Sequence, residues 1–163
     1  MSVLVLSGCS PQFDWRVVSV GDGVVTGVLP DRPRTETQQV AIGGHSIDLS
    51  MTMAEAGDVL FALGHAPLPD ALLSDREAAR TVAYELIASF YNNLNVVPPD
   101  PLPALGERFV IEGTGPAGPM HLEAVVGLGR SAVIEAVVMA TQQAYAQAPV
   151  QDFWNELKMG LSD

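Results

Sequence analysis

Three kinds of feature are scarce in this 163-residue chain, and each scarcity narrows what the protein can be. Cys9 is the only cysteine and Lys158 is the only lysine. A single cysteine cannot form an intramolecular disulfide, so we expect a reducing compartment and a cytoplasmic protein. Eight basic residues stand against 19 acidic ones, which sets the net charge at −11. Binding to nucleic acid or to an anionic membrane needs clustered Lys and Arg, so we expect neither partner.

Long hydrophobic runs are missing as well. No apolar run approaches the roughly 20 residues of a membrane-spanning helix. Leu6-Ser7-Gly8-Cys9 resembles the acylation site of bacterial lipoproteins, but Met1–Leu6 holds neither the positive charge nor the length of a signal peptide. We therefore interpret Val3–Leu6 as a buried strand and Cys9 as a turn residue. The near-absence of lysine is typical of a high-GC bacterial or phage gene.

What the chain does contain is typical of a globular protein. Apolar residues make up 48% and charged residues 17%, and the length suits one domain with its own core. The acidity favours a basic or neutral partner. The alternative is that the charge only keeps the protein soluble.

Residues 1–50 predict mainly β structure. Two pairs of short apolar segments flank glycine-containing turns that are typical of β-hairpins: Arg16–Val20 with Val24–Leu29, and Val40–Ile42 with Ser46–Leu49. The turns are Gly21-Asp22-Gly23 and Gly43-Gly44. Between the hairpins, Pro30–Thr37 predicts a polar loop.

Residues 51–96 predict two helices, because capping boxes precede apolar residues at helical spacing. The first box is Thr52-x-x-Glu55, with apolar residues to Leu63 and Gly64 as a stop; the second is Ser74-x-x-Glu77. Four prolines within residues 97–103 exclude a helix or central strand and predict a connector.

Residues 107–163 predict a β-hairpin followed by two helices. The hairpin strands are Phe109–Glu112 and Met120–Val126; the helices run from Ser131 to about Gln147 and over Gln151–Met159. The whole order predicts a single α+β domain, an antiparallel sheet with about four helices packed on one face.

Polar groups concentrate between residues 112 and 131. His121 and Glu123 are two apart on a predicted strand, so both point to one face and could form a pair for acid–base chemistry. Gly129, Arg130 and Ser131, at the predicted start of the third helix, could bind an anionic group. The alternative is that His121 and Glu123 line a solvent-facing side of the strand, with Leu122, Ala124 and Val126 facing the core.

Metal and cofactor binding are not supported. His45, His65 and His121 are far apart, without the spacing of metal ligands. Gly127-Leu128-Gly129 lacks the third glycine of a dinucleotide-binding turn. We therefore expect no metal and no cofactor.

The C-terminal segment carries an apolar stripe. Its members include Phe153, Trp154 and Leu157, and aromatic residues of this kind anchor many interfaces. The stripe predicts either closure of the protein's own core or a contact with a second subunit or a partner.

Two hypotheses follow. In the first, the chain is a non-enzymatic acidic binding or assembly protein, a homodimer that acts on a protein partner. At this coarse level it is similar to the acidic dimeric chaperones of bacterial secretion systems, without a family-specific motif. In the second, it is a small cytoplasmic enzyme or ligand-binding protein whose pocket lies between residues 113–119 and the start of the third helix. His121 would then transfer a proton, Glu123 would orient it, and Arg130 would hold an anionic small molecule.

Overall fold

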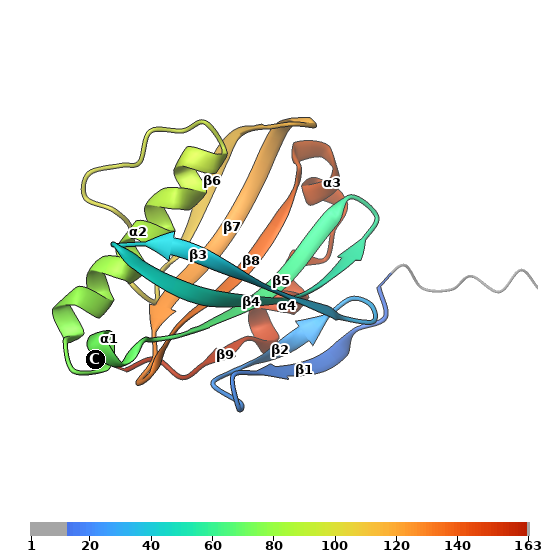
Figure 1. The fold of residues 1–163 in the computed structure, drawn as a ribbon. Helices are drawn as coiled ribbons and strands as arrows, with labels where there is room; N and C mark the ends of the chain where they lie inside the picture. Colours follow the sequence, from blue (N-terminus) through green and yellow to red (C-terminus); the bar gives the residue numbers. More distant parts are fainter. Residues whose placement is uncertain (1–12, 163) are drawn as a thin grey trace, which may run out of the picture.

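The computed structural model describes residues 13–162, which form two antiparallel sheets and four helices (Figure 1). The predicted strand Val3–Leu6 and the predicted turn at Cys9 lie outside the described residues. The strands are β1 (Arg16–Val20), β2 (Val25–Leu29), β3 (Arg34–Ile42), β4 (His45–Ala56), β5 (Val59–Pro67), β6 (Arg108–Gly115), β7 (Gly118–Leu128), β8 (Ala132–Thr141) and β9 (Lys158–Met159). The helices are α1 (Asp70–Leu73), α2 (Arg76–Asn93), α3 (Gln142–Gln147) and α4 (Val150–Glu156).

The larger sheet consists of two three-stranded meanders. Its strand order is β3-β4-β5-β8-β7-β6, so β5 and β8 pair in the middle while β3 and β6 form the two edges. The smaller sheet has the order β1-β2-β9. All pairs are antiparallel, which agrees with the predicted mixed α and β class.

Helices cover both faces of the larger sheet. Because side chains alternate along a strand, Ala62 packs into the core beneath α2, whereas Phe61 and Leu63 pack into a second core with α4 and β2. We call these the α2 face and the α4 face. The expectation that all helices pack on one face is therefore not confirmed. None of the helices in residues 13–162 has the length and apolar character needed to cross a membrane.

Several predicted elements are confirmed. Both N-terminal hairpins form, and the turn residues Asp22 and Gly43 take positive φ values of 55° and 60°. The β6–β7 hairpin and the long helix α2 are also present. The helix is capped by the side chain of Asp75, which accepts the N–H of Ala78, and not by Ser74. Residues 97–103 form an irregular connector between α2 and β6.

The predicted helix over residues 52–63 is wrong. This segment forms the β4–β5 hairpin, which turns at Gly57-Asp58. Both faces of these strands carry apolar residues, which therefore occur at odd and even positions and imitate helical spacing. The hydroxyl of Thr52 is hydrogen-bonded to that of Thr35 on β3 at 2.9 Å, so it caps no helix.

The predicted third helix is also wrong over most of its length. Residues 132–141 form β8, a central strand that is buried on both faces, and only Gln142–Gln147 is helical. A short, fully buried strand rich in Val and Ile cannot be distinguished from a buried helix by periodicity alone. Two smaller differences occur elsewhere: β3 begins at Arg34, inside the predicted loop, and α4 ends at Glu156.

Candidate functional site

His121 and Glu123 share one face of β7, as the spacing predicts, and that face is the α4 face of the sheet. Leu122 and Ala124, between and beside them, pack beneath α2. The two polar side chains do not lie open to solvent, since only 12% of His121 and 10% of Glu123 are exposed. Tyr145 of α3 lies over them, with its ring centroid 3.6 Å from that of His121.

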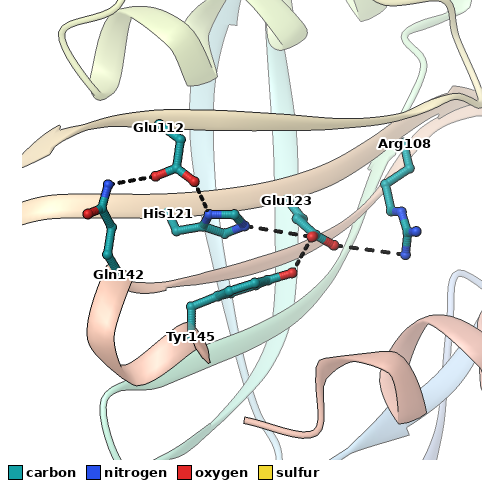
Figure 2. Close-up of polar contacts among 6 residues, drawn as sticks. All are labelled: Arg108, Glu112, His121, Glu123, Gln142 and Tyr145. Carbon is teal, nitrogen blue, oxygen red and sulfur yellow. Dashed lines mark hydrogen bonds and ion pairs between the residues drawn. The ribbon is translucent and has the colours of Figure 1, made fainter. Parts of the chain in front are cut away.

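Hydrogen bonds and a close contact between His121 and Glu123 join these residues into one polar cluster, which Figure 2 shows. His121 Nδ1 is hydrogen-bonded to Glu112 on the edge strand β6, and the amide of Gln142 donates to the same carboxylate at 2.8 Å. The hydroxyl of Tyr145 donates to Glu123 Oε1, which lies 3.6 Å from His121 Nε2. The imidazole is thus held between two carboxylates from neighbouring strands.

Arg108 completes the charge pattern on the α4 face. Its guanidinium lies 3.9 Å from Glu123 Oε2 and stacks at 5.2 Å over the ring of Trp154. Burial, reinforced by the hydrogen bond to the Glu123 carboxylate, raises the pKa of Tyr145 well above its ordinary value. Tyr145 is therefore a hydrogen-bond donor at neutral pH and not a base.

Chemically, the cluster can move or hold a proton, and it ties α3 to the sheet. Two of its buried atoms, His121 Nε2 and Glu123 Oε2, have no hydrogen-bond partner among residues 13–162. The rest of the His121 ring is enclosed by side chains of the protein itself, so the cluster also serves as a structural network. The sequence pattern does not indicate Glu112, Gln142 and Tyr145 as site residues, because only strand pairing and α3 bring them to His121.

The residues predicted to bind an anion lie at the opposite end of β7. Arg130 and Ser131, just beyond the strand, line a cavity of about 240 Å³ together with His65. Roughly 30 Å of strand separates them from His121. No helix begins at Ser131, and the N–H of Gly129 is already hydrogen-bonded to the carbonyl of Ala132. The residues of the predicted pocket therefore lie in two separate places, with His121 and Glu123 in one and Arg130 and Ser131 in the other.

The apolar stripe at the C-terminus closes the protein's own core. Phe153 is completely buried, and its ring centroid lies 5.4 Å from that of Phe61 on β5. Trp154 and Leu157 are partly buried against the same core. Phe153 is consequently not a surface residue that a partner could reach.

A second feature, an apolar cavity of about 400 Å³, lies on the α2 face. Four of the six methionines in the chain line it: Met51, Met53, Met120 and Met139. We call this cavity the methionine groove. Leu60 of β5 contributes to its floor and Phe90 of α2 to its wall. The sequence does not predict this groove, because two of the four methionines fall in segments predicted to be helical.

The groove lies beside α2. The helix contacts the edge strand β3 and packs on β7 and β6, where Tyr91 stacks on Phe109. Just past the helix, the carbonyl of Leu94 accepts the N–H of Thr114. Figure 1 shows that this course leaves part of β4, β5 and β8 uncovered. The uncovered strands present their apolar α2-face residues to the groove.

Neither feature resembles a metal centre. Within residues 13–162, no group of three or more His, Cys, Asp or Glu side chains is arranged to hold a metal ion. Comparison of the chain with protein-family models, with curated proteins and with solved structures found no match.

Proposed function

We propose that the protein is a non-enzymatic, chaperone-like binding protein that acts as a homo-oligomer and holds an apolar segment of a partner polypeptide in the methionine groove. The observation that carries the proposal is the groove itself, an apolar cavity of about 400 Å³ lined by four methionines. Cavities of a few hundred cubic ångströms with mainly apolar walls are typical of binding sites. Folding leaves this apolar surface open, whereas binding would cover it.

Methionine suits a site that must adapt to its ligand. The side chain is unbranched and polarizable, so it can repack around different apolar groups, and it is common on surfaces that bind several peptides. A rigid substrate pocket would need convergent polar groups as well. The groove walls are instead almost entirely apolar, which favours recognition of a hydrophobic segment.

Charge around the groove favours a basic or neutral partner. On β3, Arg34 and Glu36 lie beside Met53 and Met51 in the strand register. Arg34 pairs with Glu36 at 3.2 Å and with Glu55 at 3.0 Å, so two carboxylates share one guanidinium at this rim. Together with the net charge of −11, this disfavours nucleic acid and anionic membranes as partners.

Peptide binding tests the proposal directly. We would titrate the protein into fluorescent peptides of about ten residues, long enough in extended form to cross the sheet. One set carries apolar residues with flanking Lys, and a second set replaces the apolar residues by Ser. Apolar peptides should bind with a Kd of about 1–100 μM, a range typical of short-segment recognition, and Ser peptides should not.

Groove variants decide whether binding occurs at this place. The double change Met53→Gln with Met139→Gln should weaken binding at least about tenfold, since it places two amides in the apolar wall. Val17→Gln is the matched control, because Val17 is 85% exposed on β1, outside the groove. Equal loss in both variants would overturn the proposal. A second outcome would also overturn the proposal: peptides do not bind, and the double variant converts a dimer to monomers. The groove would then be a contact between two copies of the protein.

Native mass spectrometry tests the homo-oligomer. Both edges of the larger sheet, β3 and β6, are unpaired among the described residues, and unpaired edges are common sites of self-association. We expect a dimer that carries no small molecule. A monomer at working concentrations would contradict this part of the proposal.

The polar cluster around His121 supports a second candidate function, proton transfer on a small molecule. The observation that favours it is that two buried atoms of the cluster, His121 Nε2 and Glu123 Oε2, make no hydrogen bond among residues 13–162. The two candidates differ in what His121→Ala does. A binding protein should keep its peptide affinity in this variant, whereas an enzyme should lose turnover while remaining folded. A retained small-molecule mass in the native spectrum would favour the second candidate.

A further inference from the structure

Glu135, in the middle of β8, is a carboxyl group buried in an apolar core. Its residue is 2% exposed, and it lies on the α2 face, beside Val133 and Val137 on the same strand. Burial alone raises its pKa to about 7. Within the described part of the chain, its Oε2 has no hydrogen-bond partner. A buried polar atom without a partner destabilises the fold and requires an explanation.

Space for this side chain depends on Gly64, its neighbour on β5. A Cβ atom at Gly64 would clash with Cγ of Glu135, and it would lie 2.8 Å from both Glu135 Oε1 and Met51 Sδ. The carboxyl side chain therefore lies across Gly64 and extends from β8 towards β4. Met51 on β4, one of the four methionines of the groove, borders the same space above Gly64.

The strand register places Glu135 at the inner end of the methionine groove. Met51, Gly64 and Glu135 stand side by side on β4, β5 and β8. The next row outward on the same face contains Met53, Ala62 and Val137, all of which line the groove. The carboxyl group is thus one residue row beyond the floor of the cavity, behind a flexible methionine side chain.

When Glu135 is ionised, its Oε2 needs a hydrogen-bond donor that residues 13–162 of the free protein do not supply, and a ligand can supply it. A basic side chain supplies donors and a positive charge together, and charge-assisted hydrogen bonds are about twice as strong as neutral ones. An apolar side chain supplies neither and leaves the carboxyl group unsatisfied. The acidic character of the chain also favours a cationic group.

We propose that Glu135 selects a Lys or Arg side chain in the apolar segment that binds the methionine groove. The basic side chain passes Met51, which shifts to another rotamer, and its head group donates to the Glu135 carboxylate. This inference rests on the proposed function, and it adds the chemical class of the segment: apolar residues around one basic residue. Such a pair discriminates between ligands, because a segment without the opposite charge leaves the carboxylate unpaired.

The test compares two peptides in the groove-binding assay that differ at one position. One carries Lys between apolar residues, and the other carries norleucine, which keeps the aliphatic chain and removes the ammonium group. We expect the protein to prefer the Lys peptide by about tenfold or more, the usual scale of a charge-assisted hydrogen bond. In Glu135→Gln this preference should disappear, while the norleucine peptide should bind as it does to the unchanged protein.

The carboxylate of Glu156 provides the matched control. It is exposed at the end of α4 and does not line the groove. Glu156→Gln should keep the preference for Lys. If Glu135→Gln also keeps it, or if the unchanged protein shows no preference, Glu135 has no role in recognition. If neither peptide binds, the proposed function fails as well, so the two failures are distinguishable.

Discussion

The two faces of the six-stranded sheet are covered by different elements and different kinds of side chain. On the α4 face, Phe61 and Phe153 are fully buried, and Trp15, Trp154 and the β1–β2 hairpin pack around them. On the α2 face, one helix covers part of the sheet and the methionine groove remains beside it. The α4 face is filled by aromatic rings, whereas the groove on the α2 face, beside the stack of Tyr91 on Phe109, is lined by flexible thioethers.

This contrast separates stability from binding. Aromatic side chains bury a large area in a defined geometry, so the α4 face supplies a core that holds α3, α4 and the small sheet. Methionines specify one packing poorly, which is a disadvantage in a core but an advantage on a surface that adapts to a ligand. We therefore expect substitutions on the α4 face to change the free energy of unfolding, and substitutions in the groove to change affinity.

The largest effect should come from removing a ring of the α4 face. Phe153→Ala should lower the free energy of unfolding by about 3–5 kcal/mol, because it removes buried apolar area and leaves a cavity. Urea denaturation measures this loss. Phe90→Ala is the comparison on the α2 face, since Phe90 is only partly buried at the groove wall. Equal losses in the two variants would contradict the contrast between the faces.

The next largest effect concerns the buried carboxyl group of the α2 face. The folded-state pKa of Glu135 is raised from 4.5 to about 7, so its contribution to stability is fully present below pH 4.5 and is lost as the pH rises through about 7. The loss amounts to about 3 kcal/mol, given 1.36 kcal/mol for each pKa unit. Glu135→Gln should abolish it, so the variant should gain in relative stability between pH 4.5 and pH 8.

Urea denaturation across this pH range checks the prediction for Glu135. The exposed Glu156, at the end of α4, is a suitable control, and Glu156→Gln should follow the unchanged protein at every pH. A constant difference in unfolding free energy between the unchanged protein and Glu135→Gln would show that Glu135 does not titrate differently in the folded state.

Sequence patterns predicted the elements whose boundaries are marked by local chemistry. The turns at Gly21-Asp22-Gly23 and Gly43-Gly44 require positive φ values, and α2 has polar residues along its exposed side, so both kinds of element are readable without tertiary context. β8 was not readable as a strand. Its two faces pack against different layers, so its apolar run shows no alternation, and only pairing with β5 and β7 identifies it.

The candidate sites follow the same division. That His121 and Glu123 share a face is a property of one strand, and the sequence predicts it. The hydrogen bonds of His121 to Glu112 and of Glu123 to Tyr145 depend on strand pairing and on α3. Glu135 and Gly64 lie side by side although they are 71 positions apart in the sequence. Contacts of this range are set by register, which no local pattern reveals.

A smaller effect is expected where the polar cluster ties α3 to the sheet. Tyr145→Phe removes the hydroxyl that donates to the largely buried Glu123, so the free energy of unfolding should fall by about 1–2 kcal/mol. Combining it with Glu123→Gln in a double-mutant cycle isolates the coupling between the two side chains. Tyr84→Phe on α2 should be close to neutral. Additive losses at Tyr145 and Glu123 would mean that the hydrogen bond contributes nothing to stability.

The smallest change in stability should come from the groove itself. Met53 is partly buried and lines the cavity on β4, so Met53→Gln leaves its new amide within reach of water and should cost about 1 kcal/mol or less. Leu63 is fully buried on the opposite face of the neighbouring strand β5, so Leu63→Ala should lower the free energy of unfolding by about 2–5 kcal/mol. Thermal and urea unfolding of both variants measure the difference. If Met53→Gln unfolded the protein, the groove would belong to the core, and losses of peptide binding in groove variants would no longer report on recognition.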